Sequence, residues 1–335
     1  MKTNANIDKK REGKSFDSSP IRFDFSNNVE LFDYMKGWAI FLVILNHYLP
    51  ETVESLILFC VWGKMAVPIF LLVTTTLFFR KGVSTNLTFN INKLYKRAIK
   101  PYLFLVIIVY ILSILFCFET IHSASSLVIH KMGFGPGSYY VPMYVIYSFL
   151  LPLTRYFWNS HLGIACLSVI IIIISILAII FLPDNPYRIL PCRYLFLVPL
   201  GYIWATKGIE LTRLVLLLSF VSLVFLLVFH YSNLNFYPFF WTKRPWDTAN
   251  WICYFWPAFI LPFVFRHLMK LNLFNSNHFI KWLGKRSFEL FMAQMTVFYF
   301  LNNLQIIRSH IIVYGILAFF LSILPIYIYD KRKCI

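Results

Sequence analysis

The feature that most constrains the fold of this chain is a series of long apolar runs between about residue 34 and residue 329. Charged residues or clusters of Pro, Gly and Asn separate the runs. A bilayer core of about 30 Å requires roughly 20 helical residues to cross it, and most of the runs reach that length. The sequence therefore predicts an all-α integral membrane protein with about ten transmembrane helices. The predicted spans are residues 34–50, 56–79, 101–118, 138–154, 162–182, 189–206, 211–231, 250–265, 287–305 and 309–329.

The composition supports the same class. Hydrophobic residues make up 59% of the chain and charged residues only 13%, whereas a soluble domain carries about 25% charged residues. There is too little polar surface to cover a water-soluble globule. This excludes a cytosolic enzyme, a nucleic-acid-binding module and a disordered scaffold, and makes the lipid bilayer the first expected partner.

The basic residues predict how the chain is oriented. Of the 31 Lys and Arg residues, 24 fall on the side of the N-terminus if there are ten spans, and 6 fall on the opposite side. Loops rich in Lys and Arg are retained in the cytoplasm. We therefore expect both termini to be cytoplasmic in a multi-pass protein of the cell membrane, of the bacterial inner or plasma membrane type. Residues 1–30 read as a polar cytoplasmic tail, and residues 31–335 as one membrane domain.

Two predicted spans have irregular ends. The first has only about 16 residues before Pro50, against the roughly 20 that a bilayer requires. Either this helix is tilted in a locally thinned membrane, or it continues backwards from Tyr34 to Leu31 towards the cytoplasm. The fourth span contains Pro142 and follows Gly135-Pro136-Gly137, a sequence that forbids a regular helix.

The first span carries three ionisable residues, Asp33, Lys36 and His47. Ionisable groups inside a membrane are costly, so each is a candidate for a functional site. Lys36 and His47 are eleven residues apart, which places them on one helix face about 16 Å apart along the axis. Asp33 lies one turn before Lys36, close enough to pair with it. In the alternative interpretation, Asp33 and Lys36 reach interfacial water and His47 only makes a structural hydrogen bond.

These residues carry a family resemblance. Asp33-x-x-Lys36-Gly37, followed by His47 after ten residues, resembles the opening helix of the membrane-bound acyltransferase-3 family. Members of that family acylate, and usually acetylate, hydroxyls of cell-surface sugars. The commoner family pattern has Arg in the place of Lys36. Lys keeps the positive charge but lacks the planar fork that grips a carboxylate or phosphate at two points.

Later motifs extend the resemblance over about residues 31–329. Val67-Pro68-Ile69-Phe70 resembles the second helix of the family, and Lys96 to Tyr102 is similar to its Arg-x-x-Arg-x-Pro entry to the third, with Lys100 in an Arg place. Gly135 to Pro142 is similar to the aromatic-rich start of the fourth helix. Trp282 to Phe291 resembles the late Ser-Tyr stretch, although the His often found a few residues further on is Gln294 in this chain.

The resemblance implies an O-acyltransferase. Its donor would be acetyl-CoA as cosubstrate, and its acceptor a hydroxyl of a cell-surface polysaccharide or a lipid-linked glycan precursor. His47 is the expected catalytic residue, with Lys36 and Asp33 beside it on the helix. Imidazole can remove a proton at physiological pH, or can carry the acyl group transiently, and the sequence leaves both roles open.

A basic segment is the candidate site for the acyl-CoA phosphates. Residues 80–100 contain six basic residues and no acidic ones, on the predicted cytoplasmic side. Lys93, Lys96, Arg97 and Lys100 recur at spacings that place them on one helix face. The alternative is that they serve only orientation and contact with anionic lipid.

Several further polar residues are candidates for oxyanion or substrate contacts. Lys64 is predicted at the middle of the second span, where a structural ion pair is an equal alternative. Glu289 is either a counter-charge for a buried basic residue or a polar helix start. No zinc-ligand spacing or CxxC pair occurs, so no metal is expected. The full candidate set is Lys64, Asn46, Ser138, Tyr139, Tyr140, Ser287, Glu289 and Gln294.

One different class of protein also fits intramembrane Lys64 and His47. A secondary transporter or flippase for a lipid-linked sugar or small anion would carry such groups. Transporters often have Gly- or Pro-broken helices at matching places in two halves. We find no such pairing in the sequence, so the enzyme is the leading hypothesis.

Overall fold

The computed structural model confirms a helical protein. It describes residues 21–23, 29–48, 57–80, 87–116, 140–183, 190–206, 208–231, 255–272, 277–303 and 311–333. The α-helices in these ranges are α1 (Val29–Tyr48), α3 (Ile57–Arg80), α4 (Leu87–Leu94), α5 (Lys100–Leu115), α7 (Tyr140–Leu153), α8 (His161–Phe181), α10 (Leu197–Thr206), α11 (Arg213–Tyr231), α14 (Phe255–Leu271), α15 (Asn277–Lys285), α16 (Ser287–Asn303) and α18 (Ile311–Lys333). A π-helical turn, η1 (Tyr95–Ile99), and two 3-10 turns, η2 (Thr154–Asn159) and η3 (Pro191–Tyr194), complete them.

Each of the ten predicted spans overlaps one of these helices, although α10 covers only the second half of the span at residues 189–206. Three helical stretches in the described residues are long and apolar enough to cross a membrane by length and composition: Ile91–Leu115, His161–Phe181 and Val313–Arg332. The count of ten crossings and the cytoplasmic termini stay predictions. The helix expected over residues 93–100 is confirmed, and α4 extends it back to Leu87. Helix α15 was not predicted, because it lies in a segment that the sequence assigned to a cytoplasmic loop.

The structure decides between the two alternatives for the first span. Helix α1 begins at Val29 and therefore runs through Leu31 and Tyr34. Helix α7 begins at Tyr140, so Pro142 lies in its first turn, where a missing backbone N–H costs no intrahelical hydrogen bond.

The basic segment forms a continuous helical stretch from α4 through η1 into α5. Within η1 the hydrogen bonding widens, since the backbone N–H of Lys100 donates to the carbonyl of Tyr95. Pro101 follows directly and cannot donate to the carbonyl four residues before it. A π turn at this point allows the helix to continue past the proline, and such turns often lie at functional sites.

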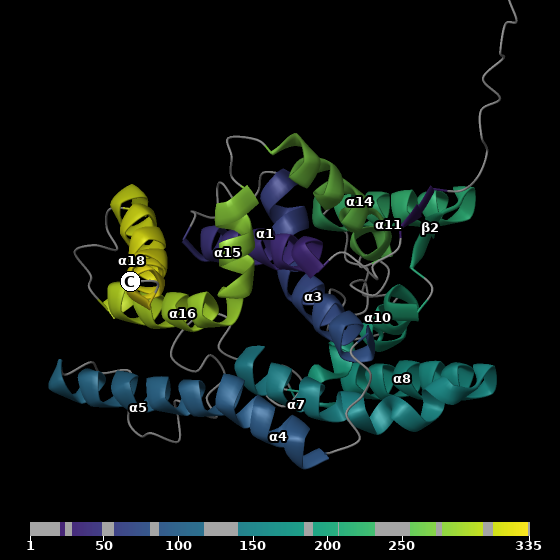
Figure 1. Ribbon diagram of the computed structural model, residues 1–335, viewed down its shortest axis with the longest axis horizontal. Coiled ribbons are helices and arrows are strands. Elements are labelled where there is room, and N and C mark those ends of the chain that lie inside the picture. Colours follow the sequence, from purple (N-terminus) through teal and green to yellow (C-terminus); the bar gives the residue numbers. More distant parts are fainter. Residues whose placement is uncertain are drawn as a thin grey trace, which may run out of the picture.

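Helices α1 and α15 are packed backbone to backbone near the centre of the molecule (Figure 1). A Cβ added at Gly37 would overlap the carbonyl oxygen of Ile280, and one at Gly284 would overlap the carbonyl oxygen of Asp33. Only glycine at both positions permits so close a crossing. Gly37 and Gly284 belong to the first and last of the motifs described above, nearly 250 residues apart in sequence, and the fold brings them together.

A two-stranded antiparallel ribbon joins the start of the chain to a later loop. Strand β1 (Ile21–Phe23) pairs with β2 (Ile209–Leu211), in the register Arg22 opposite Glu210. The sequence assigned both segments to the cytoplasmic side. The ion pair between Glu30 of α1 and Lys281 of α15, 2.7 Å from Nζ to Oε2, likewise joins two segments assigned to that side. These contacts bring the paired segments together, and their side of the membrane stays a prediction.

Candidate active site

His47 lies in the last turn of α1 and is half-buried. Its imidazole ring packs edge-on against the ring of Phe298 on α16, with 6.5 Å between the ring centroids. An edge-on contact of this kind holds the imidazole beside α16. The predicted catalytic histidine is therefore in the protein, beside α16, and does not lie on a purely lipid-facing surface.

The face of α16 that meets His47 carries a second predicted residue, Gln294. Phe291, Gln294 and Phe298 are spaced three and four residues apart, so they share one side of the helix within about 60° of arc. Gln294 is fully buried and lies one turn before Phe298. Its amide, which can both donate and accept hydrogen bonds, is thus on the helix face that contacts the imidazole.

Tyr140 joins this face from α7. Its buried ring lies 4.8 Å from the ring of Phe291 on α16 and 6.2 Å from that of Phe70 on α3, measured between centroids. Contacts from α1 and α7 thus converge on one side of α16, and α3 packs against Tyr140. Three predicted residues from separate parts of the sequence, His47, Tyr140 and Gln294, border this region. We refer to it as the α16 face, defined by Phe291, Gln294 and Phe298 and the residues that contact them.

The predicted pairing of Asp33 with Lys36 is confirmed. Lys36 Nζ lies 2.8 Å from Asp33 Oδ1, and the two side chains are 20% and 17% exposed. Because α1 is regular between Lys36 and His47, the ion pair lies about 16 Å from the imidazole along the helix axis. Asp33 also contributes the carbonyl beneath Gly284. The ion pair is therefore part of the α1–α15 crossing, and its side chains lie too far from the imidazole for direct contact.

The basic segment is exposed along its length. Lys93, Lys96, Arg97 and Lys100 all present exposed side chains, while Ala98 between them is buried. The π turn η1 packs against α7. Helix α7 in turn packs on α16 through Tyr140 against Phe291 and Tyr144 against Phe288. One helix, α7, therefore links the basic segment to the α16 face.

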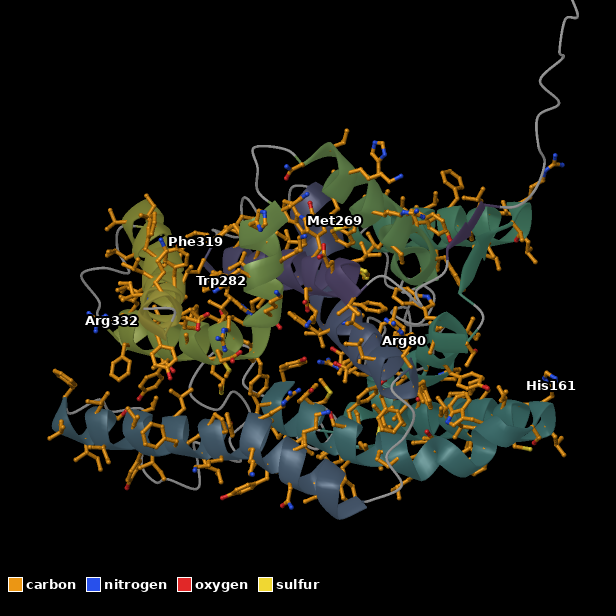
Figure 2. All side chains as sticks on the ribbon, viewed as in Figure 1. Arg80, His161, Met269, Trp282, Phe319 and Arg332 are labelled. Atoms are coloured by element: carbon orange, nitrogen blue, oxygen red, sulfur yellow. The ribbon has the colours of Figure 1, made fainter. Side chains whose placement is uncertain are left out.

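A polar cluster at the corner between α15 and α16 was not predicted. Arg286 is the single residue between the two helices, and its Nε and Nη2 donate to the two carboxylate oxygens of Asp330 on α18, at 2.7 and 2.6 Å. The Nε1 of Trp282 donates to the same carboxylate at 2.9 Å, and the Nη1 of Arg286 donates to Glu289 at 3.3 Å. Trp282 lies on the side of α15 that faces α18 (Figure 2). We call Trp282, Arg286, Glu289 and Asp330 the Arg286 cluster.

The structure gives Glu289 a place that matches parts of both alternatives from the sequence. It lies in the first turn of α16, and its carboxylate pairs with the partly exposed guanidinium of Arg286. The hydrogen bond to Asp330 is the main reason that the pKa of Arg286 lies above its ordinary value. The spacing of Trp282 and Arg286, one helical turn, indicated a shared face, but nothing in the sequence indicated Asp330 as the partner.

The remaining candidates are less fully placed. Ser287 is the buried first residue of α16. Asn46 and Lys64 lie within α1 and α3, and their side chains are outside the part of the structure that is described; Ser138 and Tyr139 lie outside it altogether. Within the described ranges, no group of three or more His, Cys, Asp or Glu side chains is arranged to hold a metal ion.

Comparison with known families identifies the class of protein. The sequence model of the acyltransferase-3 family, described as an acyltransferase domain, matches residues 29–330. The match begins at the first residue of α1 and ends at Asp330 of the Arg286 cluster. The chain belongs to this family, and it is an acyltransferase with the apolar helices of a membrane protein. No curated protein and no solved structure matches the chain.

Proposed function

We propose that this acyltransferase moves an acetyl group from acetyl-CoA to a hydroxyl of a cell-surface polysaccharide or its lipid-linked precursor. The observation that carries the proposal is the placement of His47, half-buried against α16 in a chain of this family. Acyl transfer from a thioester needs a base or a nucleophile, a donor for the developing oxyanion and a site for the carrier phosphates. The α16 face and the basic segment offer residues for each task.

Two routes through His47 are chemically complete. As a base, the imidazole takes the proton from the acceptor hydroxyl while its oxygen attacks the thioester carbon; the C–S bond breaks, and the CoA thiolate leaves and regains a proton from the imidazolium. As a carrier, an imidazole nitrogen attacks the thioester carbon, the C–S bond breaks, and the CoA thiolate takes the proton of the other ring nitrogen. The acceptor oxygen then attacks the acyl carbon, the C–N bond breaks, and the hydroxyl proton returns to the imidazole, which leaves His47 unchanged.

Gln294 is suited to assist either route. Its side-chain amide can donate a hydrogen bond to the thioester carbonyl oxygen as that oxygen becomes an oxyanion. Its complete burial on the α16 face removes competing water, which strengthens such a bond. Gln294 occupies the place where the family often has His, so the donor function is kept in a neutral group.

The basic segment is suited to the donor. Arg97 lies within the π turn and Lys100 directly follows it, and both side chains are exposed on the predicted cytoplasmic side, where acetyl-CoA is found. Because η1 packs on α7 and α7 on α16, a carrier bound at the phosphates would extend along α7 towards His47. Both termini of the protein, and the basic segment, lie in the cytoplasm in this proposal.

The first test replaces the imidazole. His47→Ala should lower acetyl transfer by about 10²- to 10⁴-fold, the usual contribution of a positioned acid–base group. Transfer is measured as CoA released from labelled acetyl-CoA by membranes that contain the cell's own glycan, and as acetyl groups per glycan repeat by mass spectrometry. His161→Ala, on an exposed histidine of α8, is the matched control and should leave transfer unchanged. Transfer near the wild-type rate in His47→Ala, at equal protein level, would refute the assignment.

The same assay without acceptor separates the two routes. The carrier route predicts release of one CoA per enzyme and retention of the label on the peptide that contains His47. The base route predicts neither, since the thioester is attacked only when a hydroxyl is present.

The donor site is tested by Arg97→Ala. Loss of one hydrogen bond to a charged group costs about 1.5 kcal/mol or more, so we expect the KM for acetyl-CoA to rise about tenfold with little change in kcat. Lys270→Ala removes an exposed basic residue of α14 and serves as the control. An unaltered KM for acetyl-CoA in Arg97→Ala would mean that the basic segment serves only to orient the protein in the membrane.

A further inference from the structure

The corner between α15 and α16 determines where the α16 face lies relative to His47. Arg286 separates the helices, yet backbone hydrogen bonds continue on both sides of it, from its N–H to the carbonyl of Trp282 and from the N–H of Leu290 to its own carbonyl. In Figure 1, α15 and α16 run in clearly different directions and meet at this corner. The angle between the two helices is therefore set at one residue.

On one side of the corner, α15 is rigidly attached to α1. The overlap that any Cβ at Gly37 or Gly284 would produce shows that the two backbones have no space between them. The ion pair of Glu30 with Lys281 lies at the exposed edge of the same crossing and contributes little to holding the helices together. Helix α1, which carries His47, and helix α15 thus form one body.

On the other side, α16 carries Gln294 and Phe298 towards His47. Phe298 is twelve residues beyond Arg286, or about 18 Å along the helix. A tilt of only about 5° at the corner would move Phe298 by about 1.6 Å over that length. Displacements of about 1 Å in a catalytic arrangement can cost about 10²-fold in rate.

The Arg286 cluster is built to prevent such a tilt. The guanidinium makes two parallel hydrogen bonds to Asp330, a geometry that fixes direction as well as distance. Trp282 ties the end of α15 to the same carboxylate, and Glu289 ties the first turn of α16 to the same guanidinium. Helix α18 is thereby attached to both sides of the corner at once, and it also packs on α1 through Phe319 against Phe41.

We propose that Arg286 and Asp330 are positioning residues of the acyl-transfer site, which fix the angle of α16 and so hold the α16 face against His47. The expected loss of catalysis rests on the proposed function. The expected change in the surroundings of His47 does not depend on that function. Because the fork of Arg286 is what fixes direction, Lys at this position would keep the charge but not the constraint.

The test combines Arg286→Lys, Asp330→Asn, Asp330→Glu and the double variant Arg286→Lys with Asp330→Asn. We expect Arg286→Lys and Asp330→Asn each to lower kcat about tenfold per folded enzyme, without a change in the KM for acetyl-CoA. The double variant should be no worse than either single variant, because both remove the same constraint. Asp330→Glu, which keeps the carboxylate, should recover part of kcat. Lys281→Met, which breaks the exposed ion pair nearby, is the control and should keep wild-type kcat.

A second readout does not require activity. The rate at which diethyl pyrocarbonate modifies His47, followed on its peptide by mass spectrometry, should change at least threefold in Arg286→Lys and stay constant in Lys281→Met. Wild-type kcat and an unchanged modification rate in Arg286→Lys would overturn the proposal, as would a lower protein level with normal kcat per folded enzyme. If His47→Ala leaves transfer intact, the proposed function fails, whereas the modification rate still decides this inference.

Discussion

Helices α1 and α8 have almost the same length, 20 and 21 residues, but opposite surroundings. In α1, Phe32, Ile40 and Ile44 are fully buried, whereas in α8 Leu162 is 75% exposed and Ile173 50%. Helix α8 is the more apolar of the two and carries no charged residue after His161, while α1 carries Asp33, Lys36 and His47. An apolar helix with an exposed face fits lipid, and the helix with ionisable groups is the one the protein encloses.

The comparison of α1 with α8 shows that the hydrophobicity of a helix and its burial are separate properties in this fold. In a water-soluble protein the most apolar helix is the most buried, because water drives it inward. In lipid there is no such drive, and helices associate through small residues, close packing and hydrogen bonds. In this protein small residues accordingly lie where helices approach most closely, with Gly37 and Gly284 between α1 and α15 and Gly201 against Thr75 between α10 and α3.

The largest effect on stability is expected at the α1–α15 crossing. Gly284→Ala forces a methyl group against the backbone of Asp33, and the helices must separate. Overpacking costs about 1–3 kcal/mol where side chains can move; against backbone we expect about 3 kcal/mol or more. The measurement is the fraction of detergent-solubilised protein that stays monodisperse after heating. The variant Lys285→Ala, at the exposed neighbouring residue, should be as stable to heating as the wild type. Equal stability of Gly284→Ala and Lys285→Ala would contradict the close contact between α1 and α15.

An intermediate effect is expected from a buried hydrogen bond between α3 and α7. The Oγ1 of Thr75 lies 2.6 Å from the hydroxyl of Tyr147, and both residues are fully buried. Thr75→Val keeps the shape but leaves the tyrosine hydroxyl without this partner, at a cost of about 1–3 kcal/mol. Thr76→Val is a matched control, since the hydroxyl of Thr76 bonds to the carbonyl of Leu72 in its own helix. The same heating assay should show a clear loss for Thr75→Val and little for Thr76→Val.

The smallest effect is expected on the exposed face of α8. Ile173→Ala should change the free energy of unfolding by less than about 0.5 kcal/mol, because the side chain is half exposed. Ile171→Ala, two residues earlier and 4% exposed, removes a packed side chain and should cost several times more. Equal losses in the two variants would show that both faces of α8 are packed against protein.

Much of the fold could be predicted from local features. Hydropathy placed a helix at each of the ten spans, and the i, i+3 spacing of Asp33 and Lys36 predicted their ion pair. Helix α15 was missed because it has only nine residues and lies in a predicted cytoplasmic loop rich in Lys and Arg. Its residues Ile280, Leu283 and Gly284 nevertheless have helical spacing and are buried. The pattern was present, but nothing local distinguished it from a loop.

The candidate site could be predicted only in part. His47, Tyr140 and Gln294 were singled out by residue type or by family motif, and their common position on the α16 face comes from the packing of α1, α7 and α16. No sequence pattern indicated the whole Arg286 cluster. Asp330 lies 44 residues from Arg286, and in the sequence it is simply the polar end of a predicted helix.

Local sequence features specify most of the helices, the membrane class and the family, because each depends on hydropathy and hydrogen bonding within short segments or on motifs in fixed order. The packing of the helices specifies which helix is enclosed, which glycines touch and which carboxylate Arg286 binds. Those choices depend on the fit of segments that lie from 44 to nearly 250 residues apart in sequence, and such a fit leaves no periodic trace in the chain.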